Sequence, residues 1–323
     1  MFHVIDLGPD GKVVASEGPE RAAPPPPGTV RWIDLVEPDP AQLEHLRARF
    51  ELHPLAIEDC ATFGLQSKIN DYDRYLFVVI HSFTADPTDA LEIQVHEIHA
   101  FVSESYIITV HDNPLPSHEV VWARAAADKA TLERGPSWIL YKHIDAMVEA
   151  TEPIVLRIRD ELDDLEWTAI EQTGYAGTLD LQKVFRIKRT SVAMRRVMRP
   201  LRDTIGILHR RNDPRISPRT LLHLRDVSDH VARLADMIEE TREVSVGVVA
   251  NHQAFTAQKV NEIIRGLTIF SAIFLPLSFI VGFFGQNFDQ LPFDSSVWLG
   301  LMLASLVLVP AGLTEWFRRN GWL

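Results

Sequence analysis

A stripe of small and hydroxyl-bearing residues runs through a long apolar segment near the C-terminus. Its members recur every three or four residues and therefore share one helix face: Asn261, Ile264, Thr268, Ser271, Leu275, Ser278 and Gly282. Around an axis formed by several copies of the helix, this face would make alternating polar and aliphatic rings that could line an ion pathway. Small residues also suit close packing between membrane helices, so the stripe alone is compatible with either use.

Most of this stripe lies in the first of two uncharged apolar runs. Residues 267–285 and 297–313 contain no Asp, Glu, Lys or Arg, and as helices they would reach roughly 25–29 Å, about the thickness of the bilayer hydrocarbon core. A buried core hairpin is the alternative, but two consecutive runs favour membrane helices. The lack of carboxylates within them argues against a proton relay inside the membrane.

The charges that flank the runs predict their orientation. Arg265 precedes the first run, and Arg318 and Arg319 follow the second, whereas the connecting residues 286–296 are acidic and contain no Lys or Arg. The positive-inside rule therefore predicts both termini in the cytoplasm and the loop outside a plasma or inner membrane. The N-terminus shows no signal-peptide pattern.

Composition excludes several classes of function. The 323 residues include 44 acidic and 32 basic ones, a formal net charge of -12 that argues against nucleic-acid binding. The single cysteine, Cys60, cannot form an intrachain disulfide and suggests a reducing compartment. The chain has no GxxxxGK[ST] nucleotide loop and no triad-like or HExxH arrangement, so neither a nucleotide site nor an enzyme is expected. The mean hydropathy of -0.01 averages a polar body with an apolar C-terminus.

The first 125 residues predict an α/β domain with a mixed sheet. Strands are expected at 31–35 and 75–83, a hairpin at 95–102 and 106–110, and a helix at 39–50 with Asp39 as N-cap and Pro40 at its first position. Residues 1–30 are weakly patterned, and Pro24 to Pro27 are expected to form a surface connector.

Helical signals replace strand signals after about residue 116. A helix over 136–171 ends in a run of acids, and the next segment is basic, so the two are expected to pair as antiparallel helices. A continuous helix is expected from about 219 to 284. Its first part carries a seam that predicts self-association: Leu224, Val227, Val231, Leu234 and Ile238.

Together these segments resemble the CorA family of divalent-cation channels. The resemblance rests on VNEIIRGLTIFSAIFLPLSFIVGFFGQNFDQLP, on YKHIDAMVEATEPIVLRIRDELDDLE, on LRDVSDHVARLADMIEE and on the basic ending with Trp322 and Leu323. It implies an N-terminal α/β cytoplasmic domain (1–125), a long helical stalk (126–262) and two C-terminal transmembrane helices (263–323) in a funnel-shaped homopentamer, with the first membrane helix lining the pore.

The resemblance also implies a Gly-Met-Asn motif at the pore mouth. Gly285 and Asn287 match it, whereas Gln286 stands in place of the Met. Because Mg²⁺ sheds water reluctantly, a ring of Asn287 amide oxygens could hold the hydrated ion through outer-sphere hydrogen bonds. Gln286 could contact the ion or brace a neighbouring helix.

Family members sense cytoplasmic Mg²⁺ at carboxylates between subunits. Asp226 in LRDVSDH matches the stalk half of that site, and Asp86 in SFTADP matches its partner in the α/β domain. For either residue alone, a solvated surface carboxylate is the alternative. The resemblance also implies a further ring of acidic residues lower on the stalk. The matching position here is Ala250, so we expect this acidic ring to be absent. Mg²⁺ held by Asp86 and Asp226 would favour a closed, symmetric pentamer.

The leading hypothesis is a passive Mg²⁺ channel that also passes Co²⁺ and Ni²⁺. A transporter of the ZntB-like branch, which carries Zn²⁺ and could couple to protons, is the alternative, and a membrane-anchored scaffold is a third. The 13 histidines do not show zinc-ligand spacing. His96 and His99 would point to opposite faces of a strand, and we expect the histidines to be scattered over the surface.

Overall fold

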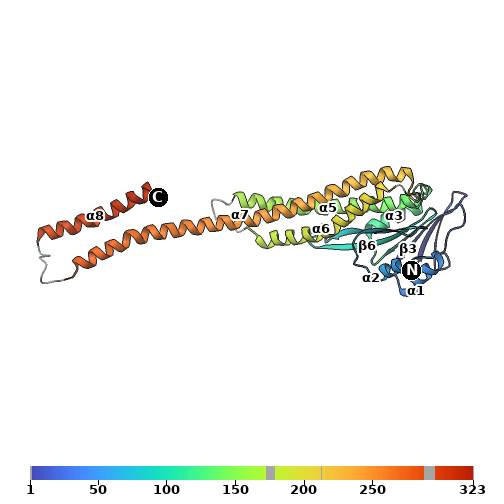
Figure 1. The fold of residues 1–323 in the computed structure, drawn as a ribbon, viewed down its shortest axis with the longest axis horizontal. Helices are drawn as coiled ribbons and strands as arrows, with labels where there is room; N and C mark the ends of the chain where they lie inside the picture. The colour runs from blue at the N-terminus through green and yellow to red at the C-terminus, as the bar shows by residue number, and fades with distance from the viewer. Residues whose placement is uncertain (1, 172–178, 212, 287–294, 323) are drawn as a thin grey trace. The chain divides into compact units, whose positions relative to one another are not determined.

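The computed structural model describes residues 2–171, 179–211, 213–286 and 295–322 (Figure 1). These residues form two compact units, Met1–Val248 and Val249–Leu323. The helix α7 (Pro218–Phe284) begins in the first unit and continues into the second. The domain boundaries at residues 125 and 262 remain predictions.

A seven-stranded sheet forms the centre of the N-terminal half. Its strands are β1 (Phe2–Leu7), β2 (Val13–Glu17), β3 (Val30–Val36), β4 (Lys68–Asp71), β5 (Leu76–Ala85), β6 (Ile93–Val102) and β7 (Tyr106–His111), in the order β2-β1-β3-β7-β6-β5-β4. The β3–β7 pair is parallel and the other pairs are antiparallel, so the predicted mixed sheet is confirmed. β1 and β2 lie in residues whose sequence pattern is weak, because polar residues interrupt β1 and β2 is a largely exposed edge strand.

Helices cover both faces of this sheet (Figure 1). On one face, α1 (Pro40–Phe50) and α2 (Pro54–Thr62) pack on a core that includes Ile33, Phe77 and Phe101. α1 begins at a capping box: Gln42 N donates to the Asp39 carboxylate at 2.8 Å and the Gln42 side chain accepts from Asp39 N. The opposite face is covered by α3 (Pro116–Ala127), by the one-turn helix α4 (Ala130–Glu133) and by α5 (Pro136–Glu171).

The expected self-associating seam is buried inside its own chain. Leu224, Val231 and Leu234 of α7 are at most 3% exposed in a single copy, and Leu234 lines a small cavity together with Met147 of α5 and Met198 of α6 (Leu181–Arg210). The inference of self-association from this seam was therefore wrong. The apolar side chains of the seam pack against α5 and α6, and these helices cover the surface through which a second copy would have bound.

The basic helix α6 does pair within the chain, but with more partners than expected. Lys183 reaches Glu161 of α5 at 3.5 Å, as the opposite charges of these helices predict. Arg195 instead pairs with Glu239 of α7, and Arg186 with Asp89 in the turn after β5. The expectation that the basic helix pairs with acidic groups of its own chain is confirmed. Its partners are not limited to the acidic end of α5, because α6 also packs beside α7.

Candidate ion pathway and regulatory carboxylates

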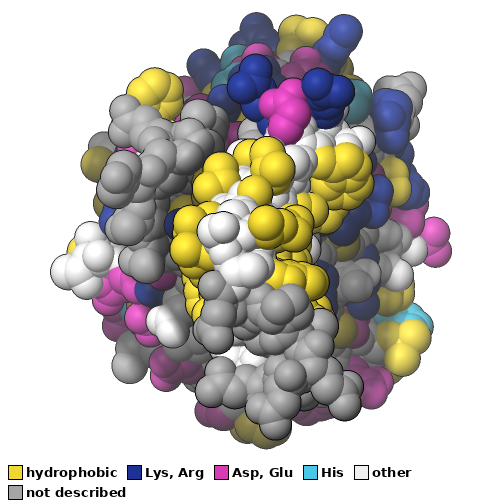
Figure 2. All heavy atoms as spheres, turned by 90° about the vertical axis from the view of Figure 1, so that its left-hand side faces the viewer, with side chains coloured by type: hydrophobic (Ala, Val, Ile, Leu, Met, Phe, Trp, Pro, Cys, Tyr) yellow, Lys and Arg dark blue, Asp and Glu magenta, His cyan; other side chains and the backbone are white. Residues whose placement is uncertain are grey.

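The second unit contains the end of α7 and α8 (Ser296–Arg319), and each of these helices has an apolar stretch at the surface. Each helix contains an 18-residue window long and hydrophobic enough to cross a membrane, and these windows have no buried residues in the structure. Figure 2 shows hydrophobic side chains gathered over the helices that face the viewer. Because exposed apolar surface of this extent is unfavourable in water, these helices belong in lipid.

The stripe on α7 lies at this surface. Ile264 is 54% exposed and Leu275 is 67% exposed in a single chain, and the hydroxyl-bearing Thr268 and Ser278 are exposed as well. One helix cannot enclose an ion, since a pathway needs walls on every side. The exposed stripe can line a pathway only if other chains complete the ring.

Bulky aromatic side chains stand apart from the stripe. The rings of Phe270 and Phe274 stack one turn apart with centroids at 5.5 Å, and those of Phe279 and Phe283 do the same at 6.3 Å. At about 100° per residue the first pair lies on one side of the stripe and the second pair on the other, so the rings flank the stripe along α7. This arrangement leaves the stripe as the face that can approach an axis closely.

The pore-mouth motif is only partly described. Gly285 N donates to the Val281 carbonyl oxygen at 2.9 Å and Gln286 N to that of Phe283 at 3.3 Å, so both residues continue the last turn of α7. A Cβ atom at Gly285 would lie 3.1 Å from the Val281 carbonyl oxygen, a tight contact that suits glycine. Asn287 lies outside the described residues, and its role stays a prediction.

Asp86 occupies an exposed turn after β5. Its Oδ1 accepts from Thr88 N at 2.7 Å and from the Thr88 hydroxyl at 2.5 Å, and these bonds lower the pKa of its carboxyl group. In the same turn, Asp89 forms an ion pair with Arg186, whereas Asp86 forms no ion pair among the described residues. Asp86 is therefore ionised and available to a cation from outside the chain.

Asp226 lies on the outer side of α7. Its side chain is 74% exposed, and the nearest opposite group is His230 Nε2 at 4.0 Å. Asp86 and Asp226 share no hydrogen-bonding partner in the described part of one chain. Both are exposed, as carboxylates that meet a cation between two subunits would have to be, but a single chain does not unite them.

The expectation of surface histidines was wrong for six of the 13. Six of the histidines are buried, and each has a polar partner within the sheet or next to it: His81, His96, His99, His111, His118 and His143. His99 contacts Cys60 of α2 and His96 contacts Thr84 of β5, so these two do point to opposite faces of β6. The buried carboxylates of Glu97 and Asp34 lie beside four of the six rings. His143 bonds instead to the Ile139 carbonyl oxygen and to His118.

Those two carboxylates are the groups that sequence reasoning missed. Glu97 contacts both His81 and His99, and Asp34 lies within 3.3 Å of both His111 and His118. The only signal was an acidic residue inside an otherwise apolar strand, as in RWIDLV and VHEIHAF.

Comparison with known proteins identifies the fold and the family. Residues 27–319 match the family described as CorA-like Mg²⁺ transporter protein. This chain belongs to the CorA family. It is therefore a divalent metal ion transporter with two C-terminal transmembrane helices, and not an enzyme.

Individual CorA-family relatives cover most of the chain. The protein YfjQ of Bacillus subtilis (strain 168) is 30% identical over 296 residues, which are 90% of this chain and 89% of YfjQ. The cobalt/magnesium transport protein CorA of Thermotoga maritima is 27% identical over 85% of this chain and 78% of its own length. The solved CorA magnesium transporter of Methanocaldococcus jannaschii superposes with a TM-score of 0.77 at 18% identity, covering 99% of this chain and 98% of that one. That structure shows the same fold: an α/β domain, a long helical stalk and two apolar C-terminal helices.

Proposed function

We propose that this CorA-family chain assembles as a homopentamer whose α7 helices surround a passive pathway for divalent cations, chiefly Mg²⁺ and also Co²⁺ and Ni²⁺. The observation that carries the proposal is the exposed stripe, because most of its residues are exposed in one chain and a ring of chains would turn it inward. Hydroxyl groups at Thr268, Ser271 and Ser278 would contact the hydration water of the ion, and Asn287 would hold the hydrated ion at the mouth.

The driving force in this proposal is the membrane potential. Moving two charges across 100 mV is worth about 4.6 kcal/mol, so entry into the cell needs no nucleotide. Five chains would carry a formal charge of about -60, and the resulting field would concentrate divalent cations near the protein. We place both termini in the cytoplasm of a plasma or inner membrane.

Regulation follows from the two exposed carboxylates. Mg²⁺ bound by Asp86 of one subunit and Asp226 of its neighbour would stabilise the closed ring, and loss of the ion would loosen it. Support comes from the ionised, unpaired state of Asp86 and from the exposure of Asp226 on the same unit.

The deciding experiment is ion uptake into proteoliposomes that enclose a Mg²⁺-sensitive dye, with a K⁺ diffusion potential imposed. We expect Mg²⁺ uptake that follows the potential and ignores a pH gradient. The substitution Asn287→Ala should lower it at least tenfold, whereas Asn320→Ala, at the far end of α8, should leave it unchanged. Uptake of Zn²⁺ that exceeds that of Mg²⁺ and follows a pH gradient would support a ZntB-like transporter instead. Absence of uptake by the wild-type protein would support a scaffold, and full flux in Asn287→Ala would remove Asn287 from the pathway.

A further inference from the structure

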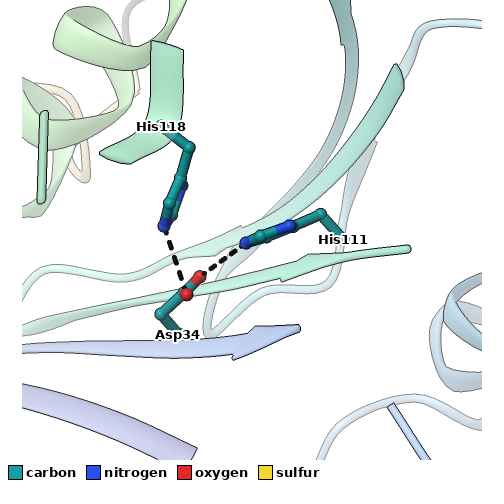
Figure 3. A group of neighbouring side chains, drawn as sticks. All are labelled: Asp34, His111 and His118. Atoms are coloured by element: carbon teal, nitrogen blue, oxygen red, sulfur yellow. Dashed lines mark ion pairs between the residues drawn. The ribbon is translucent and has the colours of Figure 1, made fainter. Parts of the chain in front are cut away.

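Three buried side chains from separate elements converge in the α/β domain (Figure 3). Asp34 lies on β3, His111 ends β7 and His118 lies in the first turn of α3. One potential ligand atom from each lies within 4.8 Å of the other two, and the three residues are at most 4% exposed. Parallel pairing of β3 with β7 sets Asp34 opposite Thr109, and His111, two residues later, extends from the same face.

Hydrogen bonds fix where the ring protons lie. His111 Nδ1 is 2.6 Å from the carbonyl oxygen of Asn113, so this nitrogen carries a hydrogen and donates it. A neutral His111 therefore presents the lone pair of Nε2 toward Asp34.

His118 reaches the same state through a second ring. His143 Nδ1 donates to the carbonyl oxygen of Ile139 at 2.8 Å, so in the neutral ring Nε2 is an acceptor. His118 Nδ1 lies 3.0 Å from this Nε2 and must be the donor between the two. A neutral His118 therefore also presents an Nε2 lone pair to Asp34.

Neither buried Nε2 atom makes a hydrogen bond of good geometry among the described residues, and each faces the Asp34 carboxylate as its ion-pair partner. His111 Nε2 lies 3.3 Å from Asp34 Oδ1, and His118 Nε2 lies 3.2 Å from Asp34 Oδ2. Ligands bound to one tetrahedral Zn²⁺ at about 2.0–2.1 Å are separated by about 3.3 Å. The two His–Asp34 separations match this value, and the three ligand atoms, all within 4.8 Å of one another, need only a small inward shift to bind one small cation.

The surroundings are those of a ligand set held in place by further hydrogen bonds. The Thr109 hydroxyl donates to Asp34 Oδ1 at 2.5 Å and accepts from Trp32 Nε1 at 2.9 Å, which orients the carboxylate. A cavity of about 250 Å³ opens beside the cluster and is also lined by Glu119 and Trp122. It leaves room for a water molecule as a further ligand and for entry of an ion.

We propose that Asp34, His111 and His118 bind a divalent transition-metal ion of the Zn²⁺ or Co²⁺ type within the α/β domain. Two imidazole nitrogens favour such ions, whereas Mg²⁺ prefers oxygen ligands. The site goes beyond the proposed transport function, because none of its residues belongs to the stripe or to the Asp86 and Asp226 pair. The bound ion would tie β3, β7 and α3 together.

The test uses the full-length protein in detergent, stripped with a chelator and then held in excess Mg²⁺ to occupy oxygen-ligand sites. Titration with Co²⁺ should give intense visible d–d absorption that saturates at one ion per chain, and Zn²⁺ should bleach it. His118→Gln and Asp34→Asn should each weaken Co²⁺ binding at least tenfold. The matched control His209→Asn, in α6, should bind as the wild type does.

Two outcomes would overturn the site: no saturable Co²⁺ absorption in excess Mg²⁺, or absorption that persists in both folded variants. Circular dichroism and gel filtration report whether the variants fold. If neither variant folds, X-ray absorption at the zinc edge of the wild-type protein tests the site. We expect a zinc ion bound by two imidazoles and oxygen at about 2.0 Å. A spectrum without imidazole would refute the proposal. Mg²⁺ uptake is measured separately, so failure of this site and failure of the transport proposal are distinguishable.

Discussion

The hydroxyl group of Thr268 donates a hydrogen bond to the carbonyl oxygen of Ile264, one turn earlier in α7, at 2.8 Å. This bond uses the only hydrogen of the hydroxyl group and holds the side chain in one orientation. The lone pairs of Oγ1 remain available at the exposed stripe. Hydration water around a cation needs such acceptors, because water bound to Mg²⁺ points its hydrogens outward.

We predict that Thr268→Val lowers Mg²⁺ flux about fivefold or more, because valine keeps the shape and removes the acceptor, and one lost hydrogen bond costs about 1 kcal/mol. Proteoliposome uptake measures the effect. The matched control is Thr314→Val in α8, whose hydroxyl donates to the Pro310 carbonyl oxygen at 2.8 Å in the same way. Equal losses in both variants would show that the back-bonded hydroxyl matters to the helix and not to the ion.

Removal of the Asp226 carboxylate should weaken inhibition by cytoplasmic Mg²⁺. Coupling energies of 1–3 kcal/mol correspond to shifts of at least about fivefold, so we expect the half-inhibitory Mg²⁺ concentration of Asp226→Ala to rise by that factor. Patch-clamp currents at stepped cytoplasmic Mg²⁺ measure it. Asp229→Ala, an exposed carboxylate one turn further on, is the control. Unchanged Mg²⁺ sensitivity in Asp226→Ala would remove this residue from the regulatory site.

Glu97 should make the stability of the α/β domain depend on acid pH. Burial opposes its ionisation, but hydrogen bonds with His81 and His99 prevail and lower its pKa from 4.5 to about 2. Gly64 N and Leu65 N also donate to its Oε2, at 2.7 and 3.0 Å. Because the folded state binds the proton less tightly, the stabilisation is present above pH 4.5 and is lost as the pH falls toward 2.

We therefore predict that Glu97→Gln lowers the free energy of unfolding at pH 7 by about 3 kcal/mol, from a pKa difference of about 2.5. Urea titration followed by tryptophan fluorescence at pH 7 and pH 3.5 measures it, and the variant should lose less stability between the two values than the wild type. Glu104→Gln, in the exposed β6–β7 turn, is the control. A Glu97→Gln protein that keeps the wild-type loss at acid pH would assign that loss to other carboxyl groups.

The orientation of the membrane helices can be tested with cysteine labelling. Cys60 is fully buried and should not react with an impermeant maleimide in the native protein. We predict that Ser296→Cys, at the start of α8, is labelled from outside intact cells. Asn320→Cys, at the end of α8, should be labelled only after the membrane is opened. Labelling of Asn320→Cys in intact cells would reverse the proposed topology.

Features that depend on neighbours along the chain were predictable from sequence. Helical spacing placed the stripe on one face of α7, because the helix repeat alone decides which residues share a face. The lack of charge in residues 267–285 marked its membrane span, because apolar length along one helix is a local property of the sequence. The N-cap at Asp39 and the β6–β7 hairpin followed from short-range signals in the same way.

Features that depend on distant parts of the chain were decided by the tertiary structure. The seam at Leu234 has the spacing of a self-associating helix, yet α5 and α6 cover it. Asp34 and His111 meet only because β3 and β7 pair in parallel, and His118 joins them only because α3 folds back over that face. Residue types and spacing predicted which helix could serve ions, whereas strand pairing and helix packing decided which polar groups were buried together, because burial and proximity are properties of the packed chain.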